Sequence, residues 1–246
     1  MRKFIVAVTT LTIVFVMYLT PVYGADILYD DFSGAYLDGA KWWPREYVCE
    51  VAGGELRFKL GNSEGMGAEV EPDKFRNRLP FANPGPITAI EADFTVQEAT
   101  RDSSPGSVSF MRINGYVYNS GGGAAIDDVM AQIFIGDRGN GGLEIFWKVQ
   151  EKLTENPITW RVLDGGTLVG SGGVSAGTPY RLKMSVEKLT DNRGRVIFEA
   201  NGQSASHTSA GPVIDPVGPY YDLTAGINAL DGFDDGFIHG TVDNVN

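Results

Sequence analysis

The chain is poor in the residues on which disulfide frameworks and histidine chemistry depend. Its 246 residues include one cysteine and two histidines. A single cysteine excludes an internal disulfide, so the core must stabilise the fold unaided. Cys49 stands in the alternating segment YVCEV, where we expect a small buried apolar residue. His207 and His239 have no acidic or serine partner at a recognisable spacing. No triad is indicated, although the members of a triad meet only in the folded chain.

Basic residues are outnumbered, with 20 Lys and Arg against 31 Asp and Glu and a net charge of −11. No block of basic residues interrupts this excess. An acidic surface repels nucleic acid and anionic membranes, so neither is expected as a partner. The composition instead suits a partner that is neutral.

Long apolar runs are absent except near the N-terminus. Two basic residues precede an apolar run over residues 4–19, and small residues at 22–24 suit a signal peptidase. This pattern predicts a secretory signal peptide over residues 1–24. The mature chain, residues 25–246, is then one exported domain in the periplasm, on the cell surface or outside the cell. A retained anchor is the alternative, but the run is shorter than the about 20 residues that a span needs. No later run is long enough to cross a membrane.

Helical periodicity is also absent after the first segment. Short runs alternate apolar and polar residues, which is typical of strands with one buried face, and turn-forming residues separate them. The runs cover residues 55–60, 87–97, 107–119, 129–137, 142–150, 158–165, 167–172, 179–188, 194–202, 221–230 and 237–245. So many short strands predict an all-β fold, a two-sheet antiparallel jelly-roll sandwich. A barrel is the less favoured alternative.

Two turns and two loops accompany these runs. The segment DNRG (191–194) predicts a hairpin in which Gly194 takes a positive φ. Gly165-Gly166 predicts a second tight turn. Residues 61–86 indicate a long loop with one short strand, and residues 120–128 indicate a second loop.

Several segments resemble those of concanavalin A-like lectin/glucanase domains, in the same order along the chain. They are YDDFSG (29–34), LDGAKW (37–42), VAGGELRF (51–58), GTPYRLKMSVEK (177–188), GRVIFEANGQ (194–203) and HGTVDNVN (239–246). The resemblance is to the LamG and laminarinase-like members of this superfamily, and it implies a β-sandwich of the concanavalin A-like type. Because this fold hosts lectins, glycosidases and adhesion modules, the resemblance does not choose among these functions.

The resemblance also implies one structural calcium ion. In the laminarinase-like members, calcium ties the first strand to the last through an acidic side chain near each end. The matching positions here are Asp31 and Asp243. Calcium takes carboxylate and carbonyl oxygens as ligands, but two carboxylates do not complete its shell. The residues by themselves therefore also fit a plain polar strand edge.

The catalytic motif of the hydrolases in this superfamily is incomplete. Those enzymes present Glu-x-Asp-x-x-Glu on one strand, and a retaining glycosidase needs two carboxylates about 5 Å apart. Glu91 and Asp93 match in part, but the third acid is missing and Glu98 falls on the other face. We therefore expect no catalytic residue here, and we expect Glu91 and Asp93 to be solvent-facing.

Binding a sugar requires less than cleaving it, namely aromatic rings for its apolar face and polar groups for its hydroxyls. Three neighbouring runs place such residues on one face if their alternation holds. These residues are Arg112, Asn114, Tyr116, Tyr118, Gln132, Phe134, Glu144, Phe146 and Lys148. The alternative is that the rings lie under the 120–128 loop as a second small core, since apolar residues on both faces mark a doubly buried strand. Trp147 and Trp160 are expected in the main core.

The sequence thus favours an exported, non-catalytic, lectin-like domain that binds carbohydrate. One alternative is a glycoside hydrolase or lyase with an unrecognised active site, which paired carboxylates of raised pKa in a groove would favour. The other is a structural or adhesion module that contacts protein surfaces, which a flat exposed apolar patch would favour.

Overall fold

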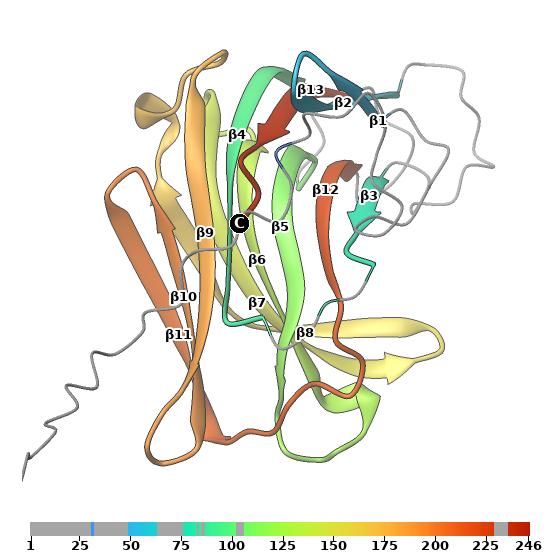
Figure 1. Ribbon diagram of the computed structural model, residues 1–246, viewed down its shortest axis with the longest axis vertical. Helices are drawn as coiled ribbons and strands as arrows, with labels where there is room; N and C mark the ends of the chain where they lie inside the picture. Colours follow the sequence, from blue (N-terminus) through green and yellow to red (C-terminus); the bar gives the residue numbers. More distant parts are fainter. Residues whose placement is uncertain are drawn as a thin grey trace, which may run out of the picture.

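Two antiparallel sheets face each other in the computed structural model, which describes residues 31, 49–62, 76–82, 84, 87–101, 106–228 and 236–246 (Figure 1). The seven-stranded sheet runs β1 (Cys49–Ala52), β2 (Glu55–Asn62), β13 (Gly236–Asp243), β4 (Ala89–Thr100), β9 (Pro179–Lys188), β10 (Arg193–Ala200) and β11 (Gln203–Pro212). The six-stranded sheet runs β3 (Arg76–Pro80), β12 (Tyr221–Asn228), β5 (Val108–Asn119), β6 (Asp128–Asp137), β7 (Leu143–Glu155) and β8 (Ile158–Val169). Short 3-10 turns follow β5 (Ala125–Asp127) and β8 (Ser171–Gly173). The expected two-sheet sandwich is confirmed.

The main core lies between the sheets and follows from the alternation in the sequence. In β4 the inward residues Ile90, Ala92, Phe94 and Val96 are buried, while their neighbours are more exposed. Trp147 of β7 stacks on Phe198 of β10 with ring centroids 4.9 Å apart, which joins the two sheets. The prediction that Trp147 belongs to the core is therefore confirmed.

Strands β5, β6 and β7 differ from β4 because both of their faces are buried. Nine consecutive residues of β6, from Asp128 to Gly136, are buried. One face supplies the core, so the other must be covered by side chains of its own sheet. That second face carries the candidate site.

Two predicted turns form differently from what the sequence indicated. The β9–β10 hairpin turns at DNRG, but Asn192 takes the positive φ of 64° and Gly194 does not. A Cβ at Gly194 would lie 2.7 Å from the buried ring of Tyr118, so the glycine is required by packing. Gly165-Gly166 forms no turn, because β8 continues through both residues alongside β7.

The sequence reading missed β11, and it expected one short strand within residues 61–86, which is β3. The β10–β11 turn is Asn201-Gly202, with φ angles of 50° and 72°. Positive φ at both central residues is typical of a type I′ hairpin. The sequence run that was expected to end at residue 202 thus continues into another strand.

Some sequence predictions fall outside the described residues. The signal peptide over residues 1–24 lies there, as does the side chain of Cys49, whose backbone begins β1. In the part of the chain that is described, no helix is long and apolar enough to span a membrane.

Candidate functional site

A groove of about 1170 Å³ lies on the outer face of the six-stranded sheet. Its floor comes from β5, β6 and β7, and β8 supplies much of one wall. The lining includes seven of the nine residues that the sequence predicted for a binding face. These are Arg112, Asn114, Tyr116, Gln132, Phe134, Phe146 and Lys148. The alternation of the three strands therefore brings them to one surface.

Strand register arranges these side chains in rows across the sheet. Residues directly opposite each other on neighbouring strands share a face. One row contains Arg112, Phe134 and Phe146, and the next contains Asn114, Gln132 and Lys148. A third row contains Tyr116, Met130, Gln150 and Val162. Charge, amides and aromatic groups thus occupy successive rows of one surface.

Three phenylalanines form a small apolar cluster in the floor. Phe134 stacks on Phe146 at 4.6 Å between centroids, and Phe110 meets Phe134 edge-on at 5.4 Å. All three rings are buried and form a cluster separate from the main core. The expectation of a second small core is therefore correct for Phe134 and Phe146. The 120–128 loop, however, contributes nothing to the groove lining.

Cations cover the phenylalanine cluster. The guanidinium carbon of Arg112 lies 5.2 Å from the Phe110 centroid and 5.6 Å from that of Phe134. Arg138 lies 4.2 Å above Phe146, and the amine of Lys148 lies 6.0 Å from the Phe134 centroid. A cation over an aromatic face is attracted to the ring quadrupole. The cluster therefore holds three positive groups along the groove.

A buried carboxylate orients the amides of the middle row. Asp222 of β12 accepts hydrogen bonds from Tyr220 OH at 2.6 Å, Thr224 Oγ1 at 2.6 Å and Asn114 Nδ2 at 3.3 Å. A carboxylate only accepts, so the Asn114 amide must present Nδ2 to it and Oδ1 to its other side. Gln132 Nε2 then donates to this Oδ1 at 3.0 Å.

The hydrogen bonds from Asp222 through Asn114 to Gln132 leave one acceptor of the described network unused, the Oε1 atom of Gln132. Gln132 is buried, and its Oε1 has no hydrogen-bond partner among the described residues. A buried polar atom without a partner is costly unless a water or a ligand satisfies it. Gln132 lines the groove, but its Oε1 is buried from solvent, so a ligand could reach this oxygen only if neighbouring side chains moved.

Three rings form an aromatic wall. Tyr116 stacks on Trp160 of β8 at 6.2 Å, with 24° between the planes, and also lies 6.2 Å from Tyr220. Burial raises the pKa of Tyr116 above its ordinary value. The prediction that Trp160 belongs to the main core is wrong, because Trp160 is partly exposed and is not among the residues of the main core. It lines the groove instead.

Two predicted members do not line the groove. Tyr118 was expected on the face of Tyr116, and that prediction is wrong. The pairing of β5 with β6 shifts between Tyr116 and Tyr118, so the bulge turns Tyr118 into the main core. Glu144 is buried at the edge of the cluster, where its carboxylate accepts from Arg138 Nε at 2.9 Å and Nη2 at 2.6 Å. It therefore positions a cation.

The sequence reading missed several lining residues. Arg78 lies on β3, within the segment expected to be mainly loop, and Tyr220 lies just before β12. The alternation of RNRLP (76–80) was an available signal for β3. Asp164 was not singled out, although it lines the groove and lies 3.1 Å from His207 Nδ1 of β11. No sequence pattern indicated this pair, since 43 residues separate its members.

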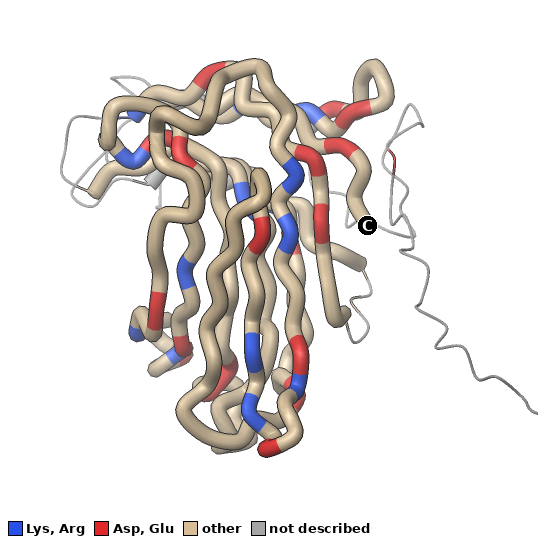
Figure 2. Tube along the Cα trace, turned by 90° about the vertical axis from the view of Figure 1, so that its left-hand side faces the viewer, with Lys and Arg blue, Asp and Glu red and all other residues tan. Residues whose placement is uncertain are grey.

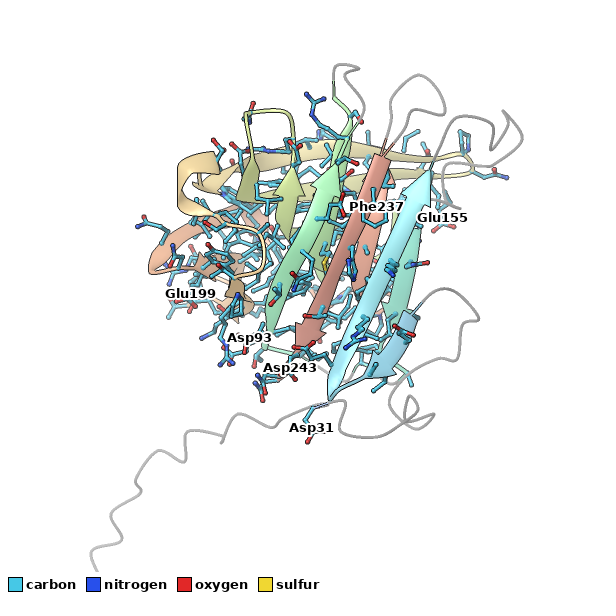
Figure 3. All side chains as sticks on the ribbon, turned by 90° about the horizontal axis from the view of Figure 1, so that it is seen from above. Asp31, Asp93, Glu155, Glu199, Phe237 and Asp243 are labelled. Atoms are coloured by element: carbon cyan, nitrogen blue, oxygen red, sulfur yellow. The ribbon has the colours of Figure 1, made fainter. Side chains whose placement is uncertain are left out.

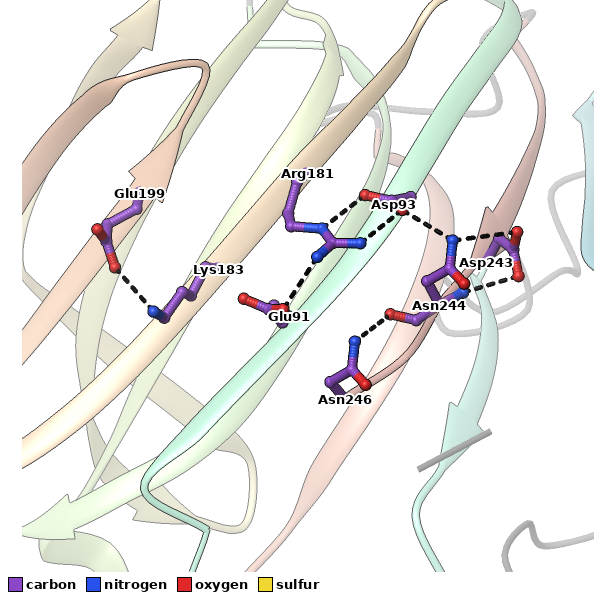
Figure 4. A network of polar contacts seen from close by, with 8 residues as sticks. All are labelled: Glu91, Asp93, Arg181, Lys183, Glu199, Asp243, Asn244 and Asn246. Atoms are coloured by element: carbon purple, nitrogen blue, oxygen red, sulfur yellow. Dashed lines mark hydrogen bonds and ion pairs between the residues drawn. The ribbon is translucent and has the colours of Figure 1, made fainter. Parts of the chain in front are cut away.

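Glu91 and Asp93 lie on the other sheet, outside the groove, and both face outward from β4. Arg181 of β9 donates to both Asp93 oxygens at 2.8 Å and to Glu91 at 3.1 Å (Figure 4). These hydrogen bonds from Arg181, followed by one from Asn244, hold the pKa of Asp93 below its ordinary value. A carboxylate held by an arginine is poorly suited to proton transfer. Both side chains lie partly exposed on the outer face of β4, as the alternation predicted.

The described residues do not assemble a calcium shell. Asp93 and Asp243 face each other on β4 and β13, and the view of Figure 3 shows Asp31 toward the same edge of the sandwich. Asp93 is held by Arg181, and Asp243 accepts from Asn244 N at 2.7 Å. No group of three or more metal-binding side chains occurs among the described residues. Since residues 32–48, which follow Asp31, lie outside them, the calcium ion stays a prediction.

Comparison with known proteins identifies the fold. No family model and no curated protein matches the chain. A κ-carrageenase from Zobellia galactanivorans is similar in structure, with 10% identity over 88% of this chain and 92% of that one and a TM-score of 0.50. The alginate lyase Aly36B has 15% identity over 89% of this chain and 93% of that one, with a TM-score of 0.50. A third similar structure was reported for endo-acting O-glycanases of the human gut microbiota, which initiate mucin breakdown. It has 11% identity over 88% of this chain and 98% of that one, with a TM-score of 0.51. These likenesses confirm the expected fold, a two-sheet jelly-roll sandwich.

Proposed function

We propose that the groove binds an acidic polysaccharide of the uronate class. The observation that carries this proposal is the sign of the charge in the groove. Arg78, Arg112, Arg138 and Lys148 line it, whereas Asp164 is the one carboxylate among the described lining residues. Arg138 is paired with Glu144, which lies outside the lining, so the excess of positive charge rests mainly on Arg78, Arg112 and Lys148. A cleft lined by one sign of charge concentrates ligands of the opposite sign. In a chain of net charge −11, a cationic groove is selective for anions.

The outer face of the seven-stranded sheet provides the contrast. Acidic and basic residues are interspersed there (Figure 2). Arg195 pairs with Glu187, and Lys183 pairs with Glu199 at 3.5 Å. Charges that cancel locally give no field for an extended anion. The whole-chain charge, which suggested a neutral partner, averages over these two different faces.

The groove also offers the groups that a sugar needs. The Trp160 and Tyr116 rings offer apolar surface to a pyranose. Arginine matches a carboxylate with two parallel N–H donors, so Arg112 suits the carboxylate of a uronate. The named activities of the similar structures, on carrageenan, alginate and mucin glycans, support a polysaccharide as the ligand.

Cleavage by β-elimination is the second candidate function. It is favoured because Lys148 and Tyr116 lie on adjacent rows of the groove. A cation beside a uronate carboxylate lowers the cost of removing the proton on the adjacent C5. A basic side chain then takes that proton, the electron pair forms the C4–C5 double bond, and the C4–oxygen bond to the leaving sugar breaks. The leaving oxygen receives a proton from an acid such as a tyrosine hydroxyl. Arg112 fits the cation beside the carboxylate and Tyr116 fits the acid, while Lys148, in its neutral amine form, would be the base that takes the C5 proton; the three lie on adjacent rows.

Hydrolysis is less well supported. A retaining glycosidase needs two carboxylates about 5 Å apart. Asp164, the one carboxylate among the described lining residues, is already paired with His207. The described groove therefore offers no second carboxylate to act with it.

The experiment is incubation of the protein with alginate, polyglucuronate and polygalacturonate. Binding would be followed by affinity electrophoresis, and cleavage by the ultraviolet absorbance of the new unsaturated sugar. Lys148→Ala is expected to weaken binding about tenfold or more, since hydrogen bonds to charged groups are worth about 1.5–3 kcal/mol. Lys183→Ala on the other sheet is the matched control.

Each outcome has a distinct meaning. Binding with ultraviolet product supports a lyase, and Tyr116→Phe should then reduce turnover more than binding. Binding without product supports a lectin. Absence of binding to every polyuronate, with a folded sample, would refute the proposal.

Calcium and export are further parts of the proposal that rest on the sequence. If calcium joins the ends of the chain through Asp31 and Asp243, adding it after chelation should raise the melting temperature of the protein, and Asp243→Ala should remove the effect. An unchanged melting temperature would contradict the calcium site. N-terminal sequencing of secreted protein, with Ala25 expected first, tests the predicted cleavage.

A further inference from the structure

Strand β8 directs a stripe of apolar side chains into the groove. Ile158, Trp160 and Val162 alternate along the strand, so they lie on one face, and all three line the groove. Ile158 and Val162 are 59% and 61% exposed, which is far more than any residue of the floor. The stripe lies near the end of the β7–β8 hairpin, which projects beyond the other strands in Figure 1.

The register of β7 with β8 gives the distance of this stripe from the cations. Val162 lies opposite Gln150, and Trp160 lies opposite Lys152, which are two and four residues along β7 from Lys148. At about 3.3 Å per residue, these rows are about 7 Å and about 13 Å from the Lys148 row. A sugar bound at Lys148 would therefore place a neighbouring sugar, or its substituent, against the stripe.

The chemistry of the stripe does not match an unmodified uronate. Aromatic rings such as Trp160 can stack on a pyranose, but branched aliphatic side chains cannot hydrogen-bond to hydroxyls or carboxylates. Ile158 and Val162 would gain from contact with a methyl group. The cations of the groove require that the carboxylate stays charged, so an ester on a hydroxyl fits better than an ester on the carboxylate.

We infer that Ile158 and Val162, which lie about 13 Å apart along β8, each contact an O-acetyl group on the acidic polysaccharide, so that together they form a subsite for acetylated sugars a few positions apart. This inference rests on the proposed function, because it assigns the substituent of the same ligand. Burial of one methyl group contributes about a fourfold gain in affinity. The protein should therefore prefer the O-acetylated form of a polyuronate over the unmodified form by about that factor or more.

The test compares alginate and polyglucuronate in unmodified, O-acetylated and methyl-esterified forms. Affinity electrophoresis in the cold would give the ratio of affinities for each pair of forms. The ratio should fall to about one in the double variant Ile158→Ser/Val162→Ser. These exposed positions contribute little to the core, so the variant should fold. Leu153→Ser is the matched control, because Leu153 is 45% exposed on the same hairpin and does not line the groove.

Several results would overturn the inference. A wild-type ratio of one, or a ratio that survives in the double variant, would refute the subsite. An equal preference for the methyl-esterified form would refute the choice of the O-acetyl group. A dimer that the double variant abolishes, without any ester preference, would assign the stripe to self-association. Absence of binding to every form would instead refute the proposed function.

Discussion

Asp222 is the residue on which the order of the groove depends most. Its carboxylate is 1% exposed and accepts three side-chain hydrogen bonds, from Asn114, Tyr220 and Thr224. Asp222→Ala removes all three acceptor contacts at once. The Asn114 amide then loses the partner that fixes its orientation, and through it the orientation of Gln132.

The expected loss of stability follows from the hydrogen-bond donors that lose Asp222 as their acceptor. An unsatisfied buried donor costs about 1–3 kcal/mol. The hydroxyls of Tyr220 and Thr224 can rotate toward other acceptors, whereas the Asn114 amide is held between two strands. Asp222→Ala should therefore lower the free energy of unfolding by about 2–3 kcal/mol, the upper part of this range, because the Asn114 donor is left without an acceptor.

Asp222→Asn provides the matched control. Its amide oxygen can still accept from Asn114 and Tyr220, and its NH₂ group can donate to Thr224, whose hydroxyl also accepts. This substitution should cost about 1 kcal/mol. The assay is urea unfolding, in which the midpoint should fall while the slope is unchanged. Equal free energies of unfolding for the two variants, within about 0.5 kcal/mol, would refute the argument that Asp222 orders this network.

Two further predictions concern the rest of the sandwich. Gly194→Ala should destabilise the protein by about 1–3 kcal/mol in thermal or urea unfolding, because the new Cβ would lie 2.7 Å from the buried ring of Tyr118; wild-type stability would contradict this packing. Arg181→Met should cost about 1 kcal/mol at neutral pH. Since Arg181 lowers the folded-state pKa of Asp93, this contribution is present above the unfolded pKa and is lost as the pH falls through the folded pKa. The two unfolding curves should therefore begin to converge as the pH falls below about 4, and a pH-independent difference would contradict the ion pair.

Sequence predicts the fold well where apolar and polar residues alternate regularly along a strand. The run from Ile90 to Val96 has one apolar and one polar face, so its inward residues could be named before the structure. The same rule placed Arg112, Asn114 and Tyr116 on one face, because β5 is regular up to Tyr116. Resemblance of short segments then sufficed for the sandwich, since it required only their type and order.

Alternation fails where a strand is irregular, and Tyr118 illustrates why. A bulge adds one residue to β5 without any clear mark in the sequence, and every later residue changes face. Trp160 fails for a related reason, because β7 and β8 contain three register shifts that direct it to the outer face. An apolar residue at such a position fits the core and a groove wall equally well, and only the register distinguishes them.

The charge of the groove is a property of register as well. Arg112, Arg138 and Lys148 are spread over 37 residues that contain both signs of charge, so no window of the sequence is basic. They gather because β5, β6 and β7 pair in one register, which also sets the phenylalanine rings beneath them. A slip of one residue between β6 and β7 would turn Lys148 into the core, where an unpaired ammonium is not tolerated. The register that keeps Lys148 out of the core is thus the same register that assembles the groove.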